Sequence, residues 1–442
     1  MNTLSRRGFI GKVALAGAAL GFPNIIPATA LARAGKASPN SKVNVALIGC
    51  GSRSQYALTY NRCEKSVVVA VCDPVKSRRL TRKQQLNGCD DYADFRQVLA
   101  RKDVDAVHIA TADHWHVPIS MMAARAGKDM YCEKPLGISI EQDKKSRAIV
   151  EKHKRMFQYG AQQRSIQHVR MGIELVLNGC IGEVQEAFVW APRGHSGGTL
   201  EKTPVPEGYD YDLWLGPAPK APFCADRCMN SGSASNGIFH IYDYAIGFVA
   251  GWGAHPADML QWWLDNAGVP NMPVSCEAKG VIPTEGLFNT LTNWDAQFVY
   301  PGGLKMRFMD DETANKEKPH PGVQGGHGTL FVGSEGWVQV NRGGWLTSSE
   351  PLRLKAKDPG SKRLPVSRGQ IENFVDSVLS REQPVDNLHS AVRSDILCHL
   401  IDISVRTGKK LEWDNKKETI VGNEKAVKMM HRDMRRPWKL EV

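Results

Sequence analysis

The stretch that most constrains this chain lies near residue 50, where an apolar run ends in two glycines. Residues 43–48 predict a strand, Gly49 and Gly51 predict a tight turn, and residues 55–62 predict the first turns of a helix. Such a turn lets backbone approach a pyrophosphate, and the helix N-terminus presents free N–H groups and a positive dipole end. Ser54 stands where the third small residue, usually Gly or Ala, belongs. On this stretch alone, a phosphate site and an ordinary glycine turn are equal alternatives.

The next apolar run adds an acidic residue at an informative spacing. Residues 67–72 end at Asp73, which follows Gly51 by 22 positions, close to the spacing at which an acid meets the ribose hydroxyls of adenosine. A helix N-cap is the plain alternative, and one residue can serve both purposes. Because an acid here repels the 2′-phosphate of NADP, we expect NAD as the cofactor, although Arg78 and Arg79 soften that preference.

Strand and helix patterns alternate from residue 42 to about residue 160. This alternation predicts a parallel sheet with helices on both faces and a ligand at the carboxyl ends of its strands. The apolar runs are residues 43–48, 67–72, 105–110, 129–132 and 156–160, and the helical segments are residues 53–62, 76–87, 117–127 and 139–154.

Two loops at this edge of the predicted sheet carry polar side chains. His114 and His116 follow the run 105–110 and are expected to point the same way from an extended loop, with capping or packing as the alternative. Glu133 and Lys134 follow the next run. A surface Glu–Lys pair at a turn is the plain interpretation, whereas a Lys at the mouth of a parallel sheet could hold a substrate hydroxyl or relay its proton.

The second half of the chain contributes two further histidines. His255 and Asp258 are three residues apart at a predicted helix start, so we expect both on one side of that helix, with Asp258 orienting His255 and a capping role as the alternative. His327 stands in a Gly-rich stretch, either on a sheet face under the substrate or in a simple turn. Arg164 follows the last strand of the first half.

The remaining elements of the second half follow from periodicity. Residues 193–250 are rich in Gly, Pro, Ser and aromatics and form the longest irregular segment, a kind of insertion that is often functional. We predict helices at residues 165–178, 367–381 and 387–408, and strands up to residue 190 and at residues 274–282, 295–300, 304–309 and 328–340.

Together these motifs resemble the Gfo/Idh/MocA family, which includes glucose–fructose oxidoreductase and inositol dehydrogenase. The resemblance covers residues 42–438 and rests on the glycine turn, Cys72-Asp73, the loop 111–116, Ala126-Gly127-Lys128 and Glu133-Lys134-Pro135. Ala112 replaces the usual Pro, and Gly251 stands where many members have an Asp. The resemblance implies a Rossmann domain of doubly wound parallel sheet at residues 42–163. It further implies an α/β domain at residues 164–438 with a large, open, mainly antiparallel sheet.

The resemblance also implies roles for individual residues. Lys134 and His255 are the expected catalytic pair, with His255 against the nicotinamide. The expected cofactor contacts are Gly49, Gly51, Ser52, Arg53, Asp73, Thr111, His116, Glu133 and Lys134, and the expected substrate contacts are Lys134, Arg164, His255, Asp258 and His327.

The expected function is hydride transfer between a carbohydrate or glycoside hydroxyl and a tightly bound NAD, with NADP as the less favoured cofactor. An NAD-dependent glycoside hydrolase that works by transient oxidation and elimination is the first alternative. A non-catalytic sugar-binding homologue is the second. The family resemblance also favours a homo-oligomer.

The first 34 residues predict an export signal rather than part of the fold. Arg6 and Arg7 precede an apolar stretch at residues 13–22, and small-x-small cleavage sites follow, a pattern typical of twin-arginine signals. About ten apolar residues are too few to span a bilayer. Because that pathway carries folded proteins, loading the dinucleotide before export explains why signal and nucleotide fingerprint occur together. We therefore expect a periplasmic protein.

Charge and cysteines exclude other classes of function. Residues 1–34 hold four of the 57 basic residues and no acid, so the remainder carries a net charge of +7. These charges are scattered without interleaved aromatics, which argues against a nucleic-acid partner. Cys224 and Cys228 are four apart and are interpreted as an ordinary loop pair, with a disulfide as the alternative. No second Cys/His pair stands at zinc spacing, so no metal site is predicted.

Overall fold

The computed structural model describes residues 42–86, 88–228 and 237–441. Its first part is a six-stranded sheet in the order β3-β2-β1-β4-β5-β6, with every neighbouring pair parallel. This is the Rossmann strand order, in which ligands bind where the order reverses, between β1 and β4. The strands are β1 (Val43–Ile48), β2 (Ser66–Cys72), β3 (Asp90–Tyr92), β4 (Ala106–Ile109), β5 (Asp129–Cys132) and β6 (Phe157–Tyr159).

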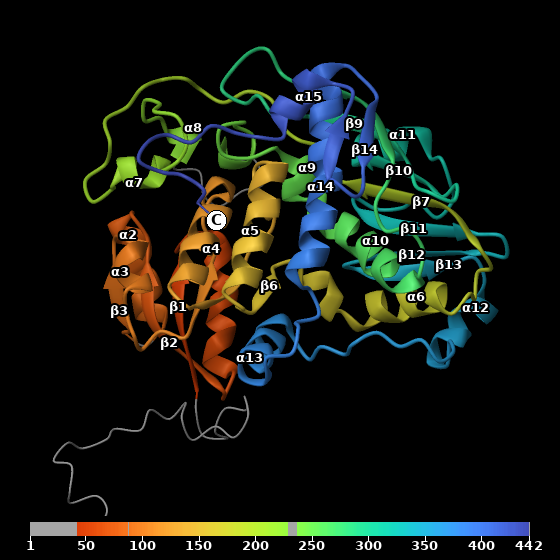
Figure 1. Ribbon diagram of the computed structural model, residues 1–442, viewed down its shortest axis with the longest axis horizontal. Coiled ribbons are helices and arrows are strands. Elements are labelled where there is room, and N and C mark those ends of the chain that lie inside the picture. The colour runs from red at the N-terminus through yellow and green to blue at the C-terminus, as the bar shows by residue number, and fades with distance from the viewer. Residues whose placement is uncertain (1–41, 87, 229–236, 442) are drawn as a thin grey trace, which may run out of the picture. The chain divides into compact units, whose positions relative to one another are not determined.

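Helices cover this parallel sheet, drawn in orange in Figure 1. They are η3 (Ser52–Arg62, a 3₁₀ helix), α2 (Lys76–Gln85), α3 (Phe95–Leu99), α4 (Asp113–Arg125) and α5 (Ile140–Lys152). The predicted alternation is confirmed, because continuous β-branched runs suit strands that are buried on both faces. The short elements β3 and α3 were not predicted.

One prediction about this half was wrong. Helix α4 begins at Asp113, so His114 and His116 lie in its first turn and not in an extended loop, with Pro118 inside the helix. Residues two apart on a helix are separated by about 200° and face different ways. The two imidazoles consequently have different neighbours.

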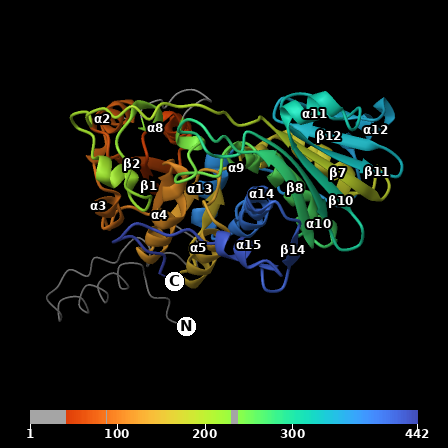
Figure 2. The ribbon, with the colours of Figure 1, turned by 90° about the horizontal axis from the view of Figure 1, so that it is seen from above.

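The second part is built on a nine-stranded sheet, which Figure 2 shows beside the parallel sheet. Its order is β13-β12-β11-β7-β10-β9-β8-β14-β15, and only β7 and β10 pair in parallel. The predicted large, mainly antiparallel sheet is confirmed. Its strands are β7 (Val184–Ala191), β8 (Ser275–Val281), β9 (Asn293–Val299), β10 (Lys305–Asp310), β11 (Gly328–Gly333), β12 (Trp337–Asn341), β13 (Gly344–Thr347), β14 (Leu411–Asp414) and β15 (Thr419–Val421). The single strand predicted at residues 328–340 is the hairpin of β11 and β12.

Helices and short turns complete the second part. They are η4 (Gln162–Ser165), α6 (Gln167–Leu177), α7 (Tyr211–Leu215), α8 (Ala225–Cys228), η5 (Gly237–Phe239), α9 (Phe248–Gly251), α10 (Ala254–Ala267), α11 (Asp311–Glu317), α12 (Glu350–Leu354), η6 (Lys355–Lys357), α13 (Gln370–Ser380), α14 (Leu388–Thr407) and α15 (Glu424–Met429).

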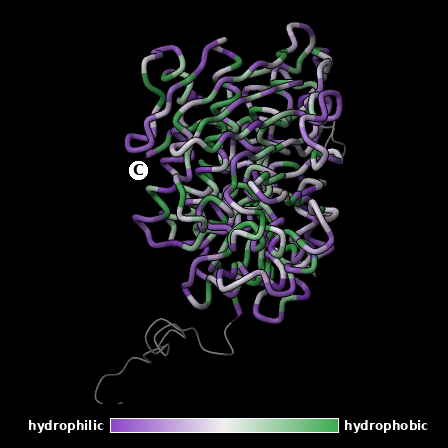
Figure 3. Tube along the Cα trace, turned by 90° about the vertical axis from the view of Figure 1, so that its right-hand side faces the viewer, coloured by the Kyte–Doolittle hydropathy of each residue, from purple (hydrophilic) through white to green (hydrophobic). Residues whose placement is uncertain are grey.

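Helix α14 joins the two parts of the fold. It packs against α5 on one side and against α10 and β8 on the other (Figure 1). Asn387 caps its first turn by accepting from the Ser390 N–H, and Gly408 ends it in the left-handed region. A continuous core includes Ile109, Ile149, Leu260 and Ile401, and apolar segments run through the interior in Figure 3. This shared core holds the parallel sheet against the elements that carry His255.

Two other sequence predictions concern the export signal and the cysteines. The twin-arginine signal predicted at residues 1–34 lies outside the described residues. In the described part of the chain, no helix has both the length and the apolar character needed to cross a membrane. Cys224 and Cys228 are buried free thiols, so the alternative of a disulfide between them is wrong.

Candidate active site

The glycine turn after β1 is shaped by two different glycines. Gly49 has φ +94°, and a Cβ there would stand 2.4 Å from the carbonyl oxygen of Ala110, next to the end of β4. Gly51 has φ −68°, and a Cβ there would meet no atom within 4 Å. Ser54, at the position of the usual third small residue, is buried and donates its hydroxyl to the Gly51 carbonyl at 2.6 Å. The first glycine lets two strands approach, and the second leaves open space beside the start of η3.

Asp73 ties this turn to the end of β2. Its Oδ2 accepts from the Cys50 N–H at 2.7 Å, and its Oδ1 accepts from the Val75 N–H at 2.8 Å. Burial raises the pKa of this carboxyl, against the lowering effect of Arg78 and of the two N–H groups. Each oxygen keeps a lone pair, so a ribose hydroxyl can still donate to it.

A cleft of about 840 Å³, open solvent at its mouth included, lies along the carboxyl ends of β1, β2 and β4. The irregular segment predicted at residues 193–250 supplies part of its wall. The residues that line the cleft include Gly49, Gly51, Ser52, Arg53, Asp73, Arg78, Thr111, Trp115, Leu213, Trp214, Ile238 and Phe239. Of the two predicted arginines near Asp73, Arg78 lines the cleft, whereas Arg79 pairs with Asp91 at 3.1 Å.

These residues fit a dinucleotide. Open space beside Gly51, the first-turn N–H groups of η3 and the Arg53 guanidinium suit a pyrophosphate, and Asp73 suits the adenosine ribose. The cleft therefore has a donor set that suits a dinucleotide.

Glu133 links the cleft to the loop that carries Lys134. Its Oε2 lies 2.8 Å from the Arg53 Nε and accepts from the Gln162 amide at 3.3 Å, while its Oε1 lies 3.7 Å from the His108 Nε2. Burial acts to raise the pKa of Glu133, but the Arg53 charge and the contact with His108 outweigh it and lower that pKa to about 2. Glu133 is thus ionised, and it is linked to the cleft through Arg53.

Lys134 lies at the centre of the site. Its ammonium group donates to the carbonyl oxygen of Gly251, at the end of α9. Burial lowers the pKa of Lys134, whereas nearby Asp113 and Glu133 act to raise it. Burial raises the pKa of Asp113 to about 7, against the effect of the Lys134 charge. Lys134 and Asp113 therefore lie close enough for the charge of each to act on the pKa of the other.

His255 is a buried histidine with Lys134 among its charged neighbours. It is 3% exposed, and its Nδ1 is buried without a hydrogen-bond partner in the described chain. Burial, followed by the charges of Lys134, Arg342 and Arg53, lowers the pKa of His255 well below its usual value. A neutral imidazole that is free to accept a proton is what a general base requires.

Two residues of this region were missed by the sequence reasoning. They are Trp252 and Arg342. The centroid of the Trp252 ring lies 6.0 Å from the centroid of the His255 ring and 5.7 Å from that of the His327 ring. The Arg342 Cζ lies 5.3 Å from the Trp252 centroid. His327, just before β11, therefore lies near His255, since both rings contact Trp252. Arg342 follows β12 in a glycine-rich turn, where no local signal marks it, although Trp252 stands in the segment already singled out for His255.

Thr111 and His116 take supporting positions. Thr111 lines the cleft. His116 is buried, and its two ring nitrogens face the Pro135 carbonyl oxygen at 2.6 Å and the Thr111 carbonyl oxygen at 3.2 Å. This imidazole joins the loop after β4 to the loop after β5. His114 packs instead against Trp214 and Tyr244.

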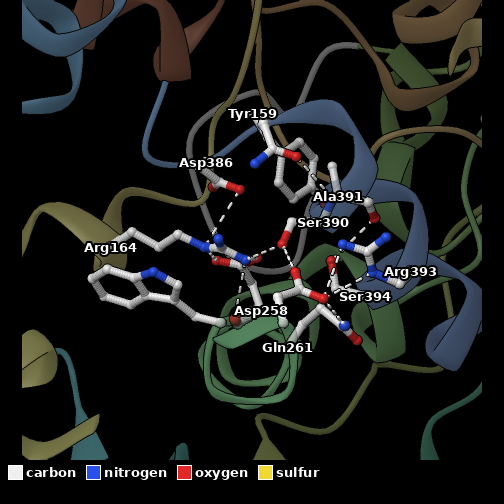
Figure 4. A network of polar contacts seen from close by, with 12 residues as sticks. Tyr159, Arg164, Asp258, Gln261, Asp386, Ser390, Ala391, Arg393 and Ser394 are labelled. Atoms are coloured by element: carbon white, nitrogen blue, oxygen red, sulfur yellow. Dashed lines mark hydrogen bonds and ion pairs between the residues drawn. The ribbon is translucent and has the colours of Figure 1, made fainter. Parts of the chain in front are cut away.

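Arg164 and Asp258 are brought together with each other and not with His255. The Arg164 Nε donates to the Asp258 Oδ2 at 2.8 Å, and its Nη2 donates to the Ser390 hydroxyl at 2.8 Å (Figure 4). Asp386 lies 3.5 Å away on the same guanidinium. All three charged groups are buried, so this network braces η4, α10 and α14 behind the site.

A second buried cluster supports the Lys134 loop. Asp395 Oδ2 accepts from the Leu136 and Gly137 N–H groups at 3.0 and 3.3 Å. His399 Nε2 lies 3.2 Å from Asp143 Oδ2, and the ligand atoms of Asp143, Asp395 and His399 all fall within 4.8 Å of one another, a spacing that suits a cation. Burial raises the pKa of Asp395 to about 7 and lowers that of His399 to about 4.

Comparison with known proteins agrees with this architecture. Residues 43–161 match the model described as "Oxidoreductase family, NAD-binding Rossmann fold", and residues 173–440 match "Oxidoreductase family, C-terminal alpha/beta domain". The rhizopine catabolism protein MocA of Rhizobium meliloti is 28% identical over 186 residues, covering 40% of this chain and 57% of that protein. A glycosyl hydrolase family 109 protein of Solibacter usitatus is 26% identical over 155 residues, covering 32% of this chain and 35% of that protein.

Solved structures extend the likeness over more of the chain. The WlbA dehydrogenase of Bordetella pertussis, solved in complex with NADH and UDP-GlcNAcA, superposes with a TM-score of 0.61 and 16% identity, covering 85% of this chain and 98% of that one. At this identity the likeness shows the fold alone. The curated relatives are matched over about half of their length or less, whereas the family models match both parts of this fold. The chain therefore belongs to the Gfo/Idh/MocA family of oxidoreductases, whose NAD-binding Rossmann fold and C-terminal α/β domain it carries.

Proposed function

We propose that this protein oxidises or reduces one carbon of a carbohydrate or glycoside by hydride transfer with NAD. The observation that carries the proposal is a buried His255, whose Nδ1 has no hydrogen-bond partner in the described chain and whose pKa is lowered by burial and by the nearby Lys134 charge. The alignments with known relatives cover only part of each chain, so the activity is argued from the site.

Lys134 and His255 have complementary roles in this reaction. The bound dinucleotide supplies the hydride acceptor or donor. Neutral His255 takes the proton of the reacting hydroxyl when the alcohol is oxidised and returns it in the reverse direction. The Lys134 ammonium group, held by the Gly251 carbonyl, has further N–H groups to donate to the same oxygen and stabilises the charge that develops there. Arg53 and the first turn of η3 hold the pyrophosphate.

NAD is the cofactor we propose over NADP. Asp73 is fixed at the ribose position by two backbone N–H groups, and its charge opposes a 2′-phosphate. Arg78 lines the same cleft and is the residue through which NADP would be tolerated. Mass spectrometry of small molecules released from the denatured protein tests this directly. Release of NAD or NADH is expected, whereas NADP or no nucleotide would contradict the proposal.

The catalytic assignment is tested with K134A and H255A. Both variants are expected to keep bound nucleotide and to lose carbohydrate-dependent NADH formation by about 10²-fold or more. A K134A enzyme with normal turnover would contradict the role of Lys134. A wild-type protein that binds a sugar without forming NADH would instead favour a non-catalytic sugar-binding protein.

A second function is favoured by the similarity to a glycosyl hydrolase family 109 protein. In such an enzyme bound NAD would accept a hydride from the sugar before elimination of the aglycone and return it after water adds, while Lys134 and His255 would handle the protons. Incubation with nitrophenyl glycosides and no added NAD separates the two functions. Catalytic release of nitrophenol would replace the dehydrogenase proposal with the hydrolase.

We infer that the protein works in the periplasm as a homo-oligomer with tightly held NAD. The twin-arginine pattern at Arg6 and Arg7 supports export of a folded, cofactor-loaded protein. Cell fractionation of wild type and of an R6K/R7K double variant tests the localisation, because the variant should stay in the cytoplasm. Sedimentation of the purified protein tests the oligomer.

A further inference from the structure

The second domain presents a cation to the site that no carboxylate neutralises. The Arg342 guanidinium lies over the Trp252 ring, 5.3 Å from its centroid, on the side chain that also contacts His255 and His327. No ion pair or hydrogen bond involves Arg342 in the described residues, and its strongest electrostatic neighbour is Arg53, another cation. An arginine that stacks on an aromatic ring and has another cation as its charged neighbour is available to bind an anion.

The surrounding charges do not supply that anion. Glu133 is committed to Arg53 at 2.8 Å. Asp113 lies beside Lys134 and is the remaining acid of the site. Lys134 itself donates only to a neutral carbonyl, that of Gly251. With Glu133 paired to Arg53 and Asp113 beside Lys134, Arg342 is the cation of this group that has no acid beside it in the described chain.

Two unpartnered polar atoms belong to rings that contact Trp252. Nδ1 of His255 and Nε2 of His327 are buried and lack hydrogen-bond partners in the described chain, and both rings contact Trp252. Buried polar atoms are ordinarily satisfied, so two on rings of the same cluster indicate a polar ligand.

We propose that the substrate is a carbohydrate bearing an oxyanion, a carboxylate or a phosphate, which Arg342 binds while the reacting hydroxyl lies between Lys134 and His255. This inference rests on the proposed function and names its substrate class. A guanidinium matches the two oxygens of a carboxylate or phosphate in a bidentate geometry, and such charge-assisted bonds are the strong ones.

The pyrophosphate of the cofactor is the competing anion for Arg342. Arg342 does not line the cleft that holds the glycine turn and Asp73, and it comes from the hairpin of the second domain. Arg53 and the start of η3 already serve the pyrophosphate. We therefore assign Arg342 to substrate.

The test uses the purified, NAD-loaded protein and matched ligands. Calorimetry at low ionic strength compares glucose with glucuronate and with glucose 6-phosphate, and galactose with galacturonate and with galactose 6-phosphate. The variants are R342Q and the control R353Q, whose guanidinium lies 5.9 Å from the Trp345 ring and pairs with Glu350 outside the site. NADH affinity and NADH formation are measured on the same samples.

An acidic sugar is expected to bind about ten- to a hundredfold tighter than its neutral partner, and R342Q, but not R353Q, should abolish that difference. If the uronates bind tighter than the sugar phosphates, the group that Arg342 binds is a carboxylate. If the sugar phosphates bind tighter, that group is a phosphate. The proposal fails if no acidic sugar binds tighter than its neutral partner. It also fails if R342Q weakens the binding of NADH instead of the binding of acidic sugars. Oxidation of the neutral sugars in that case would leave the proposed function standing, whereas tight binding of an acid without any NADH formation would count against the proposed function alone.

Discussion

The guanidinium of Arg53 lies 2.8 Å from the carboxylate of Glu133, so the residue after the glycine turn is tied to the residue before Lys134. Arg53 lines the cleft that we propose for the cofactor, and Glu133 belongs to the loop that carries Lys134. Because Glu133 is buried and Arg53 is about half-exposed, the pair fixes the distance between the two loops without closing the cleft.

E133Q should reduce the stability of the protein in a pH-dependent way. The pKa of Glu133 in the folded protein, about 2, is below that of an unfolded Glu. The stabilisation is therefore fully present above about pH 4.3 and is lost as the pH falls through about 2. We expect wild type to exceed E133Q by about 1–2 kcal/mol near neutral pH, a value reduced by solvent screening at Arg53. Urea unfolding from pH 7 to pH 3 measures the difference, and a gap independent of pH would contradict this account.

D113N should move the alkaline limb of activity to lower pH. Asp113 raises the pKa of Lys134, which burial otherwise lowers, so a neutral amide leaves the ammonium group easier to deprotonate. In the proposed mechanism the ammonium group is the active form, and activity falls as it loses its proton. The pH range over which kcat/KM stays high should therefore end at a lower pH in D113N than in wild type. Its acid limb, which reports neutral His255, should remain below pH 6.5. An unchanged alkaline limb would show that Asp113 does not raise the pKa of Lys134.

The two glycines of the turn should respond to alanine in opposite ways. G49A places a Cβ 2.4 Å from a carbonyl oxygen at φ +94°, so it should destabilise the fold. G51A has an ordinary φ and an unobstructed Cβ, so stability should stay within about 0.5 kcal/mol of wild type. The added methyl group would stand in the space proposed for the pyrophosphate and should weaken NADH binding about tenfold or more. Thermal melts and NADH titration separate the effects. Normal NADH affinity in G51A would contradict the assignment of the cleft.

Local signals predicted the parts of the site that one segment determines. The run into Gly49 and Gly51 and the acid at Asp73 need only a strand, a turn and a spacing. The same holds for Glu133 and Lys134, because the carboxyl ends of parallel strands meet at one edge.

The remaining contacts depend on segments far apart in the sequence. Helical spacing places Asp258 near His255, but Arg164, which precedes Asp258 by 94 residues, lies in η4 in contact with α10 and pairs with the carboxylate. Arg342 is an ordinary charged residue in a hairpin turn until the fold places it over Trp252. His114 and His116 diverge because α4 begins at Asp113, a boundary of the kind that sequence patterns locate least well.

R164Q decides whether Arg164 contacts substrate, as the sequence pattern predicts, or supports the fold, as its contacts indicate. Removing the guanidinium leaves the buried carboxylates of Asp258 and Asp386 without their common cation, which should cost about 3–5 kcal/mol of unfolding free energy. R193Q is the matched control, because its ion pair with Glu312 is about half-exposed and should be worth no more than about 1 kcal/mol. Urea unfolding measures both variants, and KM is measured on the folded fraction. A large loss of stability with an unchanged KM would assign Arg164 to the support behind α10. Unchanged stability with a raised KM would instead require that the guanidinium turn toward the substrate.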